Sequence, residues 1–62
     1  HEALERLPAK QKEALLLFEV YGFSLAEIQE MQQDSLSAVK QRLKRGREKL
    51  AQMLGAEEAL SE

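Results

Sequence analysis

The chain has 62 residues, with 9 Lys and Arg against 11 Asp and Glu, a formal net charge of −2 and no cysteine. A chain this short forms one domain, and without cysteine it has neither a disulfide framework nor a thiolate metal site. The single histidine, His1, has no companion, and no apolar run approaches the roughly 20 residues that cross a bilayer, so we expect no metal, no cofactor and no membrane partner.

A short helical turn at residues 2–6 and then a longer helix are expected in the first third of the chain. Pro8 suits the first position of that helix, where its missing N–H would be unpaired anyway. From Ala9 onward five side chains share one side at spacings of three and four, which predicts a helix. Leu16 and Leu17 widen its apolar surface, so we expect this helix to be covered on more than one side. Gly22 is expected to end it, because glycine adopts positive φ without strain. The residues expected on the shared side are Gln11, Ala14, Leu15, Phe18 and Tyr21.

A second, shorter helix is expected to begin at a capping box. In residues 24–27, Ser-Leu-Ala-Glu, the serine hydroxyl can accept from the N–H three residues on, while Glu27 reaches back to the Ser24 N–H. Leu25, Ile28 and Met31 follow at intervals of three and are expected on the buried face. Residues 32–34, Gln-Gln-Asp, break the apolar rhythm, and we interpret them as a turn.

The longest helix is expected over residues 35–54. Either Asp34 or Ser35 can cap its start, and Gly55 is expected to end it. Apolar or small side chains recur at spacings of 3, 4, 3, 4 and 3 residues, which predicts a single buried stripe. The stripe consists of Leu36, Val39, Leu43, Gly46, Leu50 and Met53.

The polar side chains of this helix are expected on its other sides, and most of them are basic. Residues 40–49 contain six basic residues and one acid, a balance of +5, whereas the other positions carry three basic residues and ten acids, a balance of −7. Binding of a polyanion depends on this local field, because charges beyond about 10 Å are screened at 0.1 M salt. Opposite the stripe we expect Ser37, Gln41, Lys44 and Glu48 with Arg45 beside them, Lys40 and Arg47 on one flank, and Arg42 and Lys49 on the other.

We therefore predict an all-α fold, a small four-helix domain with a helix-turn-helix made of the capped short helix, a tight turn and the basic helix. The domain is expected to span residues 1–55. Residues 56–62 are expected to form an acidic tail that is either a short helical turn or disordered. Because the first residue is His1 rather than Met, we interpret the chain as one module of a longer protein.

Two segments of the sequence resemble a known family. Residues 22–28 read Gly-Phe-Ser-Leu-Ala-Glu-Ile, and residues 39–50 read Val-Lys-Gln-Arg-Leu-Lys-Arg-Gly-Arg-Glu-Lys-Leu. Together with Leu7-Pro8 and the Glu-Ala-Leu of residues 13–15, they resemble region 4, the C-terminal promoter-binding domain of bacterial sigma factors of the extracytoplasmic-function class. The resemblance covers about residues 4–54, and its pieces occur in the family's order and spacing.

The resemblance implies a cytoplasmic role and three partners. Region 4 of such factors binds the −35 promoter element of double-stranded DNA through the second helix of its helix-turn-helix. It also docks on the β flap of the RNA polymerase core. Many members are held inactive by an anti-sigma factor that covers these surfaces.

The same resemblance implies a DNA-binding site on the basic helix. By position, Lys40, Gln41, Lys44 and Arg45 would face bases, since Lys and Arg donate to guanine and Gln pairs with adenine. The two arginines at positions 42 and 47 would contact phosphates or brace the helix against the domain. If all six cations met phosphates, the salt slope of binding would be at most about −5. The DNA-binding residues so expected are Ser37, Lys40, Gln41, Arg42, Lys44, Arg45 and Arg47.

Five positions depart from the family pattern. Gln33 and Asp34 occupy the turn, where a small residue and an aliphatic one are usual, and Asp34 is expected to repel phosphates. Ala38 stands where threonine is common, and Gln41 where serine is common. Gly46 replaces an alanine, at a cost of up to about 1 kcal/mol in a helix interior.

Two other functions are open at this point. A LuxR-type response-regulator DNA-binding domain shares the four-helix plan and a Val-Lys pair at the start of its recognition helix. A sigma-like module that binds an anti-sigma protein without reading DNA is favoured by Asp34, Ala38 and the acidic remainder, and opposed by the basic block. The sequence has no nucleophile paired with a base and no glycine-rich phosphate loop, so we predict no enzymatic activity.

Overall fold

The computed structural model describes residues 2–61 of the chain, and the side chains of residues 3–55. The predicted all-α fold is confirmed, with no strand in the part that the structure describes. Turns at residues 6–8, 21–24 and 33–35 separate the helical segments. These segments are α1 (Glu2–Glu5), α2 (Ala9–Leu15), η1 (Leu16–Val20), α3 (Leu25–Gln32) and α4 (Leu36–Ser61).

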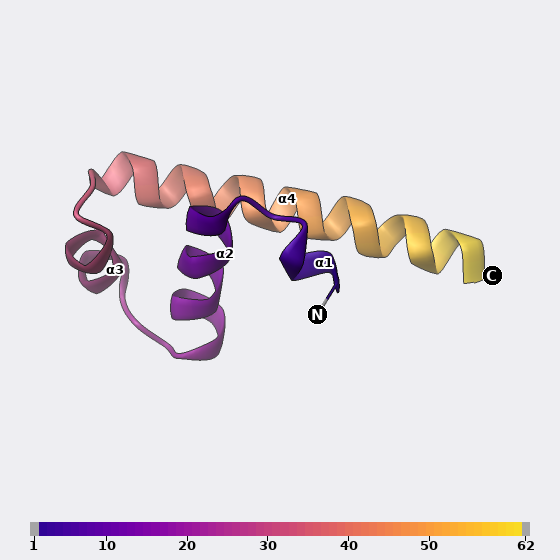
Figure 1. The fold of residues 1–62 in the computed structure, drawn as a ribbon, viewed down its shortest axis with the longest axis horizontal. Coiled ribbons are helices and arrows are strands. Elements are labelled where there is room, and N and C mark those ends of the chain that lie inside the picture. Colours follow the sequence, from indigo (N-terminus) through magenta and orange to yellow (C-terminus); the bar gives the residue numbers. More distant parts are fainter. Residues whose placement is uncertain (1, 62) are drawn as a thin grey trace.

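The long helix α4 is the axis on which the other helices are assembled (Figure 1). Helix α2 and its continuation η1 run across the first half of α4, α3 packs near its start, and α1 lies alongside its middle. The end of α4 extends past all of them, so the molecule measures 42 × 19 × 16 Å. The helix-turn-helix is formed by α3, the turn at residues 33–35 and α4.

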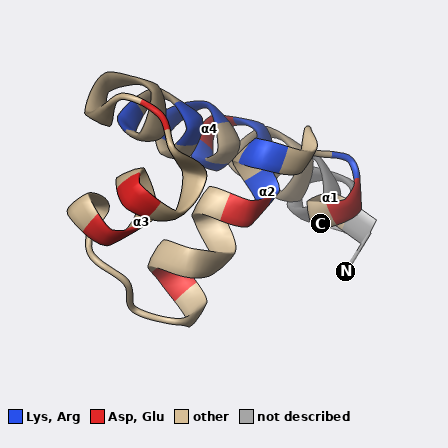
Figure 2. Cartoon of the chain, turned by 60° about the vertical axis from the view of Figure 1, so that its left-hand side comes forward, with Lys and Arg blue, Asp and Glu red and all other residues tan. Residues whose placement is uncertain are grey.

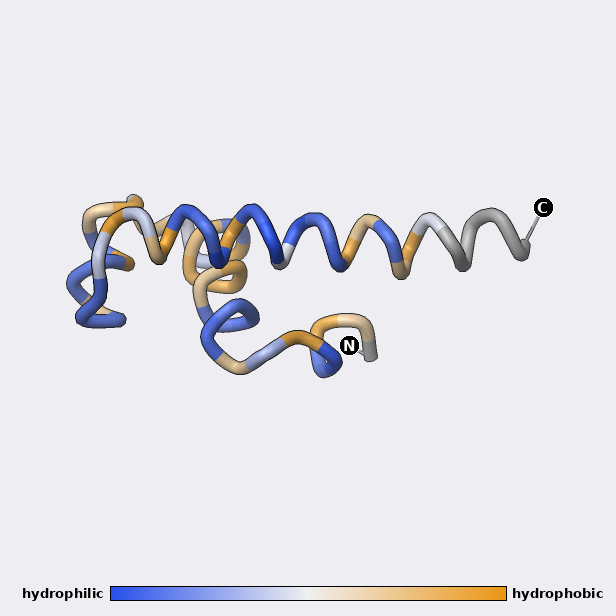
Figure 3. The backbone as a smooth tube through the Cα atoms, turned by 90° about the horizontal axis from the view of Figure 1, so that it is seen from above, coloured by the Kyte–Doolittle hydropathy of each residue, from blue (hydrophilic) through white to orange (hydrophobic). Residues whose placement is uncertain are grey.

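The core lies where α2 and α3 meet the first half of α4, and apolar segments gather there in Figure 3. The predicted stripe of α4 is confirmed at Val39, Leu43 and Gly46, which are buried, and Leu50 and Met53 pack against the core. Leu36 is different, because its side chain is 39% exposed. It stands in the first turn of α4, just after the turn at 33–35. The fully formed core is Leu7, Ala14, Leu15, Ile28, Val39 and Leu43.

The helix that begins at Ala9 changes character halfway. Pro8 is its N-cap rather than its first helical residue, with φ −54° and ψ 145°. From Leu16 the chain forms a π turn, in which the Tyr21 N–H donates to the Leu16 carbonyl at 3.0 Å. A π turn holds more residues than an α turn, so Tyr21 rotates off the buried side and is 68% exposed. The prediction that Tyr21 shares the buried side is therefore wrong, whereas the turn at Gly22 is confirmed by its φ of 77°.

Helix α3 begins as expected and buries a different last residue. The capping box is present, with Ser24 Oγ accepting from the Glu27 N–H at 3.1 Å and Glu27 Oε1 accepting from the Ser24 N–H at 2.8 Å. Met31, predicted on the buried face, is 48% exposed, and Gln32 is buried in its place. Two successive intervals of three residues, from Leu25 to Met31, drift around a helix, whereas residue 32 stands four after Ile28 and returns to its side.

Helix α4 starts at the cap that the sequence offers and does not end where the sequence suggests. Ser35 Oγ accepts from the Ala38 N–H at 3.1 Å, which makes Ser35 the cap. The helix then continues through Gly55 to Ser61, so the predicted end at Gly55 is wrong. Glycine costs about 1 kcal/mol in a helix interior, and the residues that follow it, Ala-Glu-Glu-Ala-Leu, are strong helix formers. The backbone of residues 56–61 of the acidic tail is thus part of α4, and Glu62 lies outside the described residues.

Candidate nucleic-acid interface

The side of α4 opposite its buried stripe is exposed and carries polar and basic side chains. Ser37, Lys40, Gln41, Lys44 and Arg45 are all exposed, as their positions on the helix predict. The buried stripe fixes this outcome, since turning Val39 and Leu43 into the core turns these side chains outward. We call Lys40, Gln41, Lys44 and Arg45 the cationic face. Figure 2 shows the basic residues concentrated on α4 while α3 carries acidic ones.

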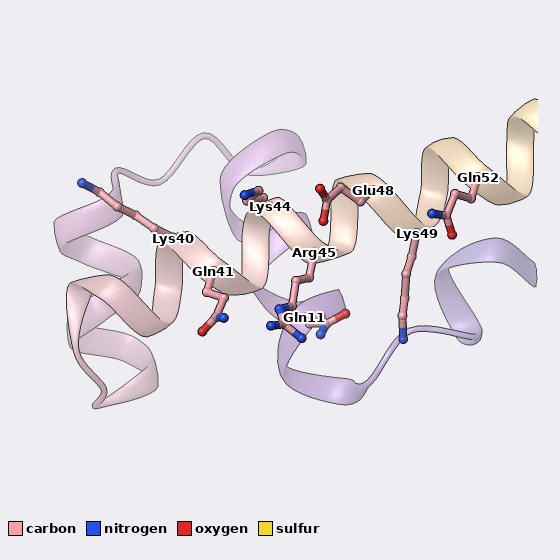
Figure 4. A pocket seen from close by; sticks show the side chains of 8 residues that line it. All are labelled: Gln11, Lys40, Gln41, Lys44, Arg45, Glu48, Lys49 and Gln52. Carbon is pink, nitrogen blue, oxygen red and sulfur yellow. The ribbon is translucent and has the colours of Figure 1, made fainter.

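The cationic face borders a shallow groove. The groove has a volume of about 560 Å³, and seven of its eight lining residues come from α4 (Figure 4). The eighth, Gln11, comes from α2 and was not expected in a site. We call this hollow the cationic groove; it is lined by Gln11, Lys40, Gln41, Lys44, Arg45, Glu48, Lys49 and Gln52.

Arg42 does not line the cationic groove and holds the helix-turn-helix together. Its guanidinium donates to Gln32 Oε1 at 2.8 Å and forms an ion pair with Asp34 in the turn. Only 17% of the Arg42 side chain is exposed. Of the two roles expected for Arg42, phosphate contact or bracing, this geometry is the bracing one.

The pairing with Arg42 also compensates the negative charge of Asp34. The Arg42 hydrogen bond, together with the Ser35 backbone N–H, lowers the pKa of Asp34 below its ordinary value. The carboxylate is therefore charged and compensated by a cation of the same domain. A compensated carboxylate repels a nearby phosphate less than the isolated one that the sequence suggested.

Gln32 is a polar core residue that sequence reasoning missed. Its amide nitrogen donates to the Lys10 carbonyl at 3.2 Å and to Glu13 Oε1 at 2.9 Å, and its oxygen accepts from Arg42. The amide thus links α2, α3 and α4. Its only signal in the sequence was its spacing of seven from Leu25 and four from Ile28, and its polar side chain hid that signal.

Arg47 is held on the opposite flank of α4. It forms an ion pair with Glu19 of η1, and its guanidinium lies 5.3 Å from the centre of the Phe18 ring. A guanidinium at this distance from an aromatic ring gains cation–π attraction. Arg47 therefore joins α4 to η1, about half of its side chain remaining exposed.

The remaining cations of α4 have no such anchor. Lys40, Lys44, Arg45 and Lys49 make no ion pair with any side chain that the structure describes. Three of the four belong to the cationic face, and Lys49 lines the same groove. Glu48 is the one acid among the groove's lining residues. The surface can therefore receive a polyanion along one side of a single helix.

Other kinds of site find no support in the described residues. No group of three or more His, Cys, Asp or Glu side chains among them is arranged to hold a metal ion. None of the helices in the described range combines the length and apolar character that a bilayer span requires.

Comparison with known proteins assigns the chain to a family. A family model described as sigma-70, region 4, matches residues 1–50, which include α1 to α3 and the basic half of α4. No curated protein and no solved structure matched the chain. Region 4 is the C-terminal promoter-binding domain of sigma factors, and the match favours it over the LuxR-type alternative. The chain belongs to the sigma-70 region 4 family and is a DNA-binding domain of the sigma factor type.

Proposed function

We propose that this domain is region 4 of an extracytoplasmic-function sigma factor and that it reads the −35 promoter element with α4 in the major groove. The observation that carries the proposal is the division of α4 into a buried apolar stripe and an exposed cationic face. An α-helix fits the major groove of B-DNA, where each base pair presents a distinct pattern of donors and acceptors. The cationic face offers the side chains that read such a pattern.

Lys40, Gln41, Lys44 and Arg45 are assigned to base edges in this proposal. Arg and Lys donate to O6 and N7 of guanine, and Gln pairs with N6 and N7 of adenine. Ser37, exposed near the start of α4, is assigned to a phosphate or a base edge next to them. Arg42 and Arg47 are assigned to holding α4 at its angle, because both are engaged with carboxylates of the domain.

Two protein partners complete the proposal. The resemblance to extracytoplasmic-function factors supports docking on the β flap of RNA polymerase and control by an anti-sigma factor. A hollow of about 350 Å³, lined in part by Leu16, Leu17 and Tyr21, shares no residue with the cationic groove. This apolar surface leaves room for a protein contact while DNA occupies α4.

A titration of labelled DNA with the chain tests the proposal. We would select a duplex from a randomised library with the parent chain and compare it with a shuffled duplex at two salt concentrations. Lys44→Ala and Arg45→Ala should each weaken binding of the selected duplex by about 1–3 kcal/mol. Both side chains are exposed, so circular dichroism melts should match the parent.

Arg6→Ala is the matched control, because Arg6 is an exposed arginine that does not line the cationic groove. It removes the same charge as Arg45→Ala and should leave the preference for the selected duplex intact. If neither Lys44→Ala nor Arg45→Ala weakens binding more than Arg6→Ala, the assigned face is wrong. If the parent binds no DNA even at low salt, the proposal is wrong and the result supports the alternative of a module that binds an anti-sigma protein.

A further inference from the structure

Helix α2 packs tightly against α4 at Gly46. A Cβ atom at this position would lie 2.7 Å from Leu15 Cδ1 and 3.8 Å from the Gln11 carbonyl oxygen. Because residue 46 has no side chain, the Leu15 side chain of α2 fits against α4 here. Gln11 consequently emerges at the edge of the cationic groove.

Gln11 is shared by two neighbouring hollows. It lines the cationic groove and also a smaller hollow of about 320 Å³ beside it. Gln41 and Arg45 line both hollows as well. In Figure 4 the Gln11 side chain rises from α2 next to Arg45, while the other labelled side chains come from α4. Among the described residues, Gln11 is the one contribution of another helix to either hollow.

The amide of Gln11 has an unused acceptor. Its Oε1 atom is buried and has no hydrogen-bond partner among the described residues. Buried polar atoms are nearly always paired, and leaving one unpaired is costly. A guanidinium carries five N–H donors in a fixed plane, and Arg45, which lines the same two hollows, makes no ion pair with a described side chain.

We propose that Gln11 is a positioning residue of the DNA interface, whose amide oxygen accepts a hydrogen bond from Arg45 when Arg45 turns toward a base. The bond uses one edge of the guanidinium and leaves the other edge to donate to guanine O6 and N7. Helix α2 thereby takes part in base reading without touching the base. The inference rests on the proposed function, because it assigns Arg45 to a base edge.

A double-mutant cycle separates positioning from direct contact with DNA. We would measure dissociation constants of the parent, Gln11→Met, Arg45→Ala and the double variant for the selected and shuffled duplexes. A bidentate pair discriminates by roughly five- to 150-fold, so Gln11→Met should lower the ratio of the two constants by about fivefold or more. In the Arg45→Ala background the same change should leave the ratio unaltered.

Gln11→Glu is the rescue variant, because a carboxylate keeps the acceptor at the same reach. Its added negative charge should weaken binding of both duplexes while preserving their ratio, which a merely structural role of Gln11 would not predict. A loss of preference that is equal in the parent and Arg45→Ala backgrounds would overturn the inference and indicate that Gln11 contacts DNA itself. An unchanged ratio in Gln11→Met would overturn it as well.

Binding measurements on the parent chain alone test the proposed function. A parent chain that binds both duplexes equally well reads no sequence, and both the function and the inference then fall. If the parent discriminates and Arg45→Ala does not impair it, Arg45 is not a base-reading residue and the inference falls while DNA binding stands.

Discussion

The cations of α4 divide into two groups that share one helix and behave differently. Arg42 and Arg47 lie on the flanks, where each meets a carboxylate from another part of the domain. The other four, Lys40, Lys44, Arg45 and Lys49, are exposed and make no ion pair with any described side chain. The two arginines are thus held by the turn before α4 and by η1, whereas the other four cations meet solvent.

This difference shows that a local charge balance overstates the field available to DNA. The balance of +5 over residues 40–49 counts Arg42 and Arg47, whose partners Asp34 and Glu19 stand outside that range in sequence. Two of the six cations therefore stabilise the position of α4. The remaining four lie along the cationic groove and are the ones offered to a polyanion.

Removing Arg42 should have the largest effect on the fold. In Arg42→Met the aliphatic part of the side chain is kept, while Gln32 Oε1 loses its donor and Asp34 its counter-ion. An unsatisfied buried acceptor costs about 1–3 kcal/mol, so the free energy of unfolding should fall by that amount. Urea unfolding followed by circular dichroism measures it.

The matched control is Lys40→Met, which replaces an exposed cation two residues earlier on the same helix. A surface change of this kind stays within about 0.5 kcal/mol of the parent. Equal unfolding midpoints for the two variants would show that Arg42 is as dispensable to the fold as Lys40. The distinction between cations that stabilise the fold and cations offered to DNA would then be wrong.

The salt dependence of DNA binding should show a smaller difference between the two groups. If only four cations meet phosphates, the slope of log K against log salt is no steeper than about −3.6, against about −5 for six. Between 50 and 200 mM salt the affinity should then fall by at most about 150-fold rather than about 1,000-fold. Fluorescence anisotropy of a labelled duplex over this range measures the slope.

Single substitutions sharpen that measurement. Lys49 lines the groove and is not assigned to a base edge, so Lys49→Gln should make the slope shallower by up to about 0.9, whereas Arg47→Gln should leave it unchanged. A parent slope near −5 would mean that Arg42 and Arg47 leave their carboxylates for phosphates in the complex.

Features set by short stretches of sequence were predictable. The capping box joins residues three apart, so Ser24 and Glu27 predict it without any knowledge of the fold. The stripe through Val39 and Leu43 follows from the helical period alone, and the exposure of Lys44 follows from the stripe.

Features that depend on a partner distant in sequence were not predictable. Gln32 can be buried because its amide forms hydrogen bonds with Lys10, Glu13 and Arg42. No local sequence pattern predicts these three partners. Gly46 looked like a cost to the helix, yet Leu15 occupies the space that a side chain would need. Gln11 was expected on the buried side of the helix that begins at Ala9. It lines the cationic groove only because α2 packs on α4.

The smallest expected effect is a pH dependence that comes from exposed carboxyl groups. The Arg42 hydrogen bond lowers the pKa of Asp34, the Ser24 backbone N–H lowers the pKa of Glu27, and Lys12 lowers the pKa of Glu5. A carboxyl whose folded pKa lies below its unfolded value stabilises the fold fully above the unfolded value. That contribution is lost as the pH falls through the lower, folded pKa.

The melting temperature should therefore be constant from neutral pH down to about pH 5 and should decrease below about pH 4, the ordinary range of Asp and Glu. Asp34→Asn should have a shallower decrease, since one of the three carboxyls no longer titrates, whereas Glu30→Gln, at an exposed acid of α3, should follow the parent. Carbon-detected NMR of the carboxyl groups reports the pKa of Asp34 directly. If Asp34 titrates at or above the ordinary aspartate value, Arg42 is not held by it in solution and belongs with Lys44 and Arg45 among the cations that DNA can engage.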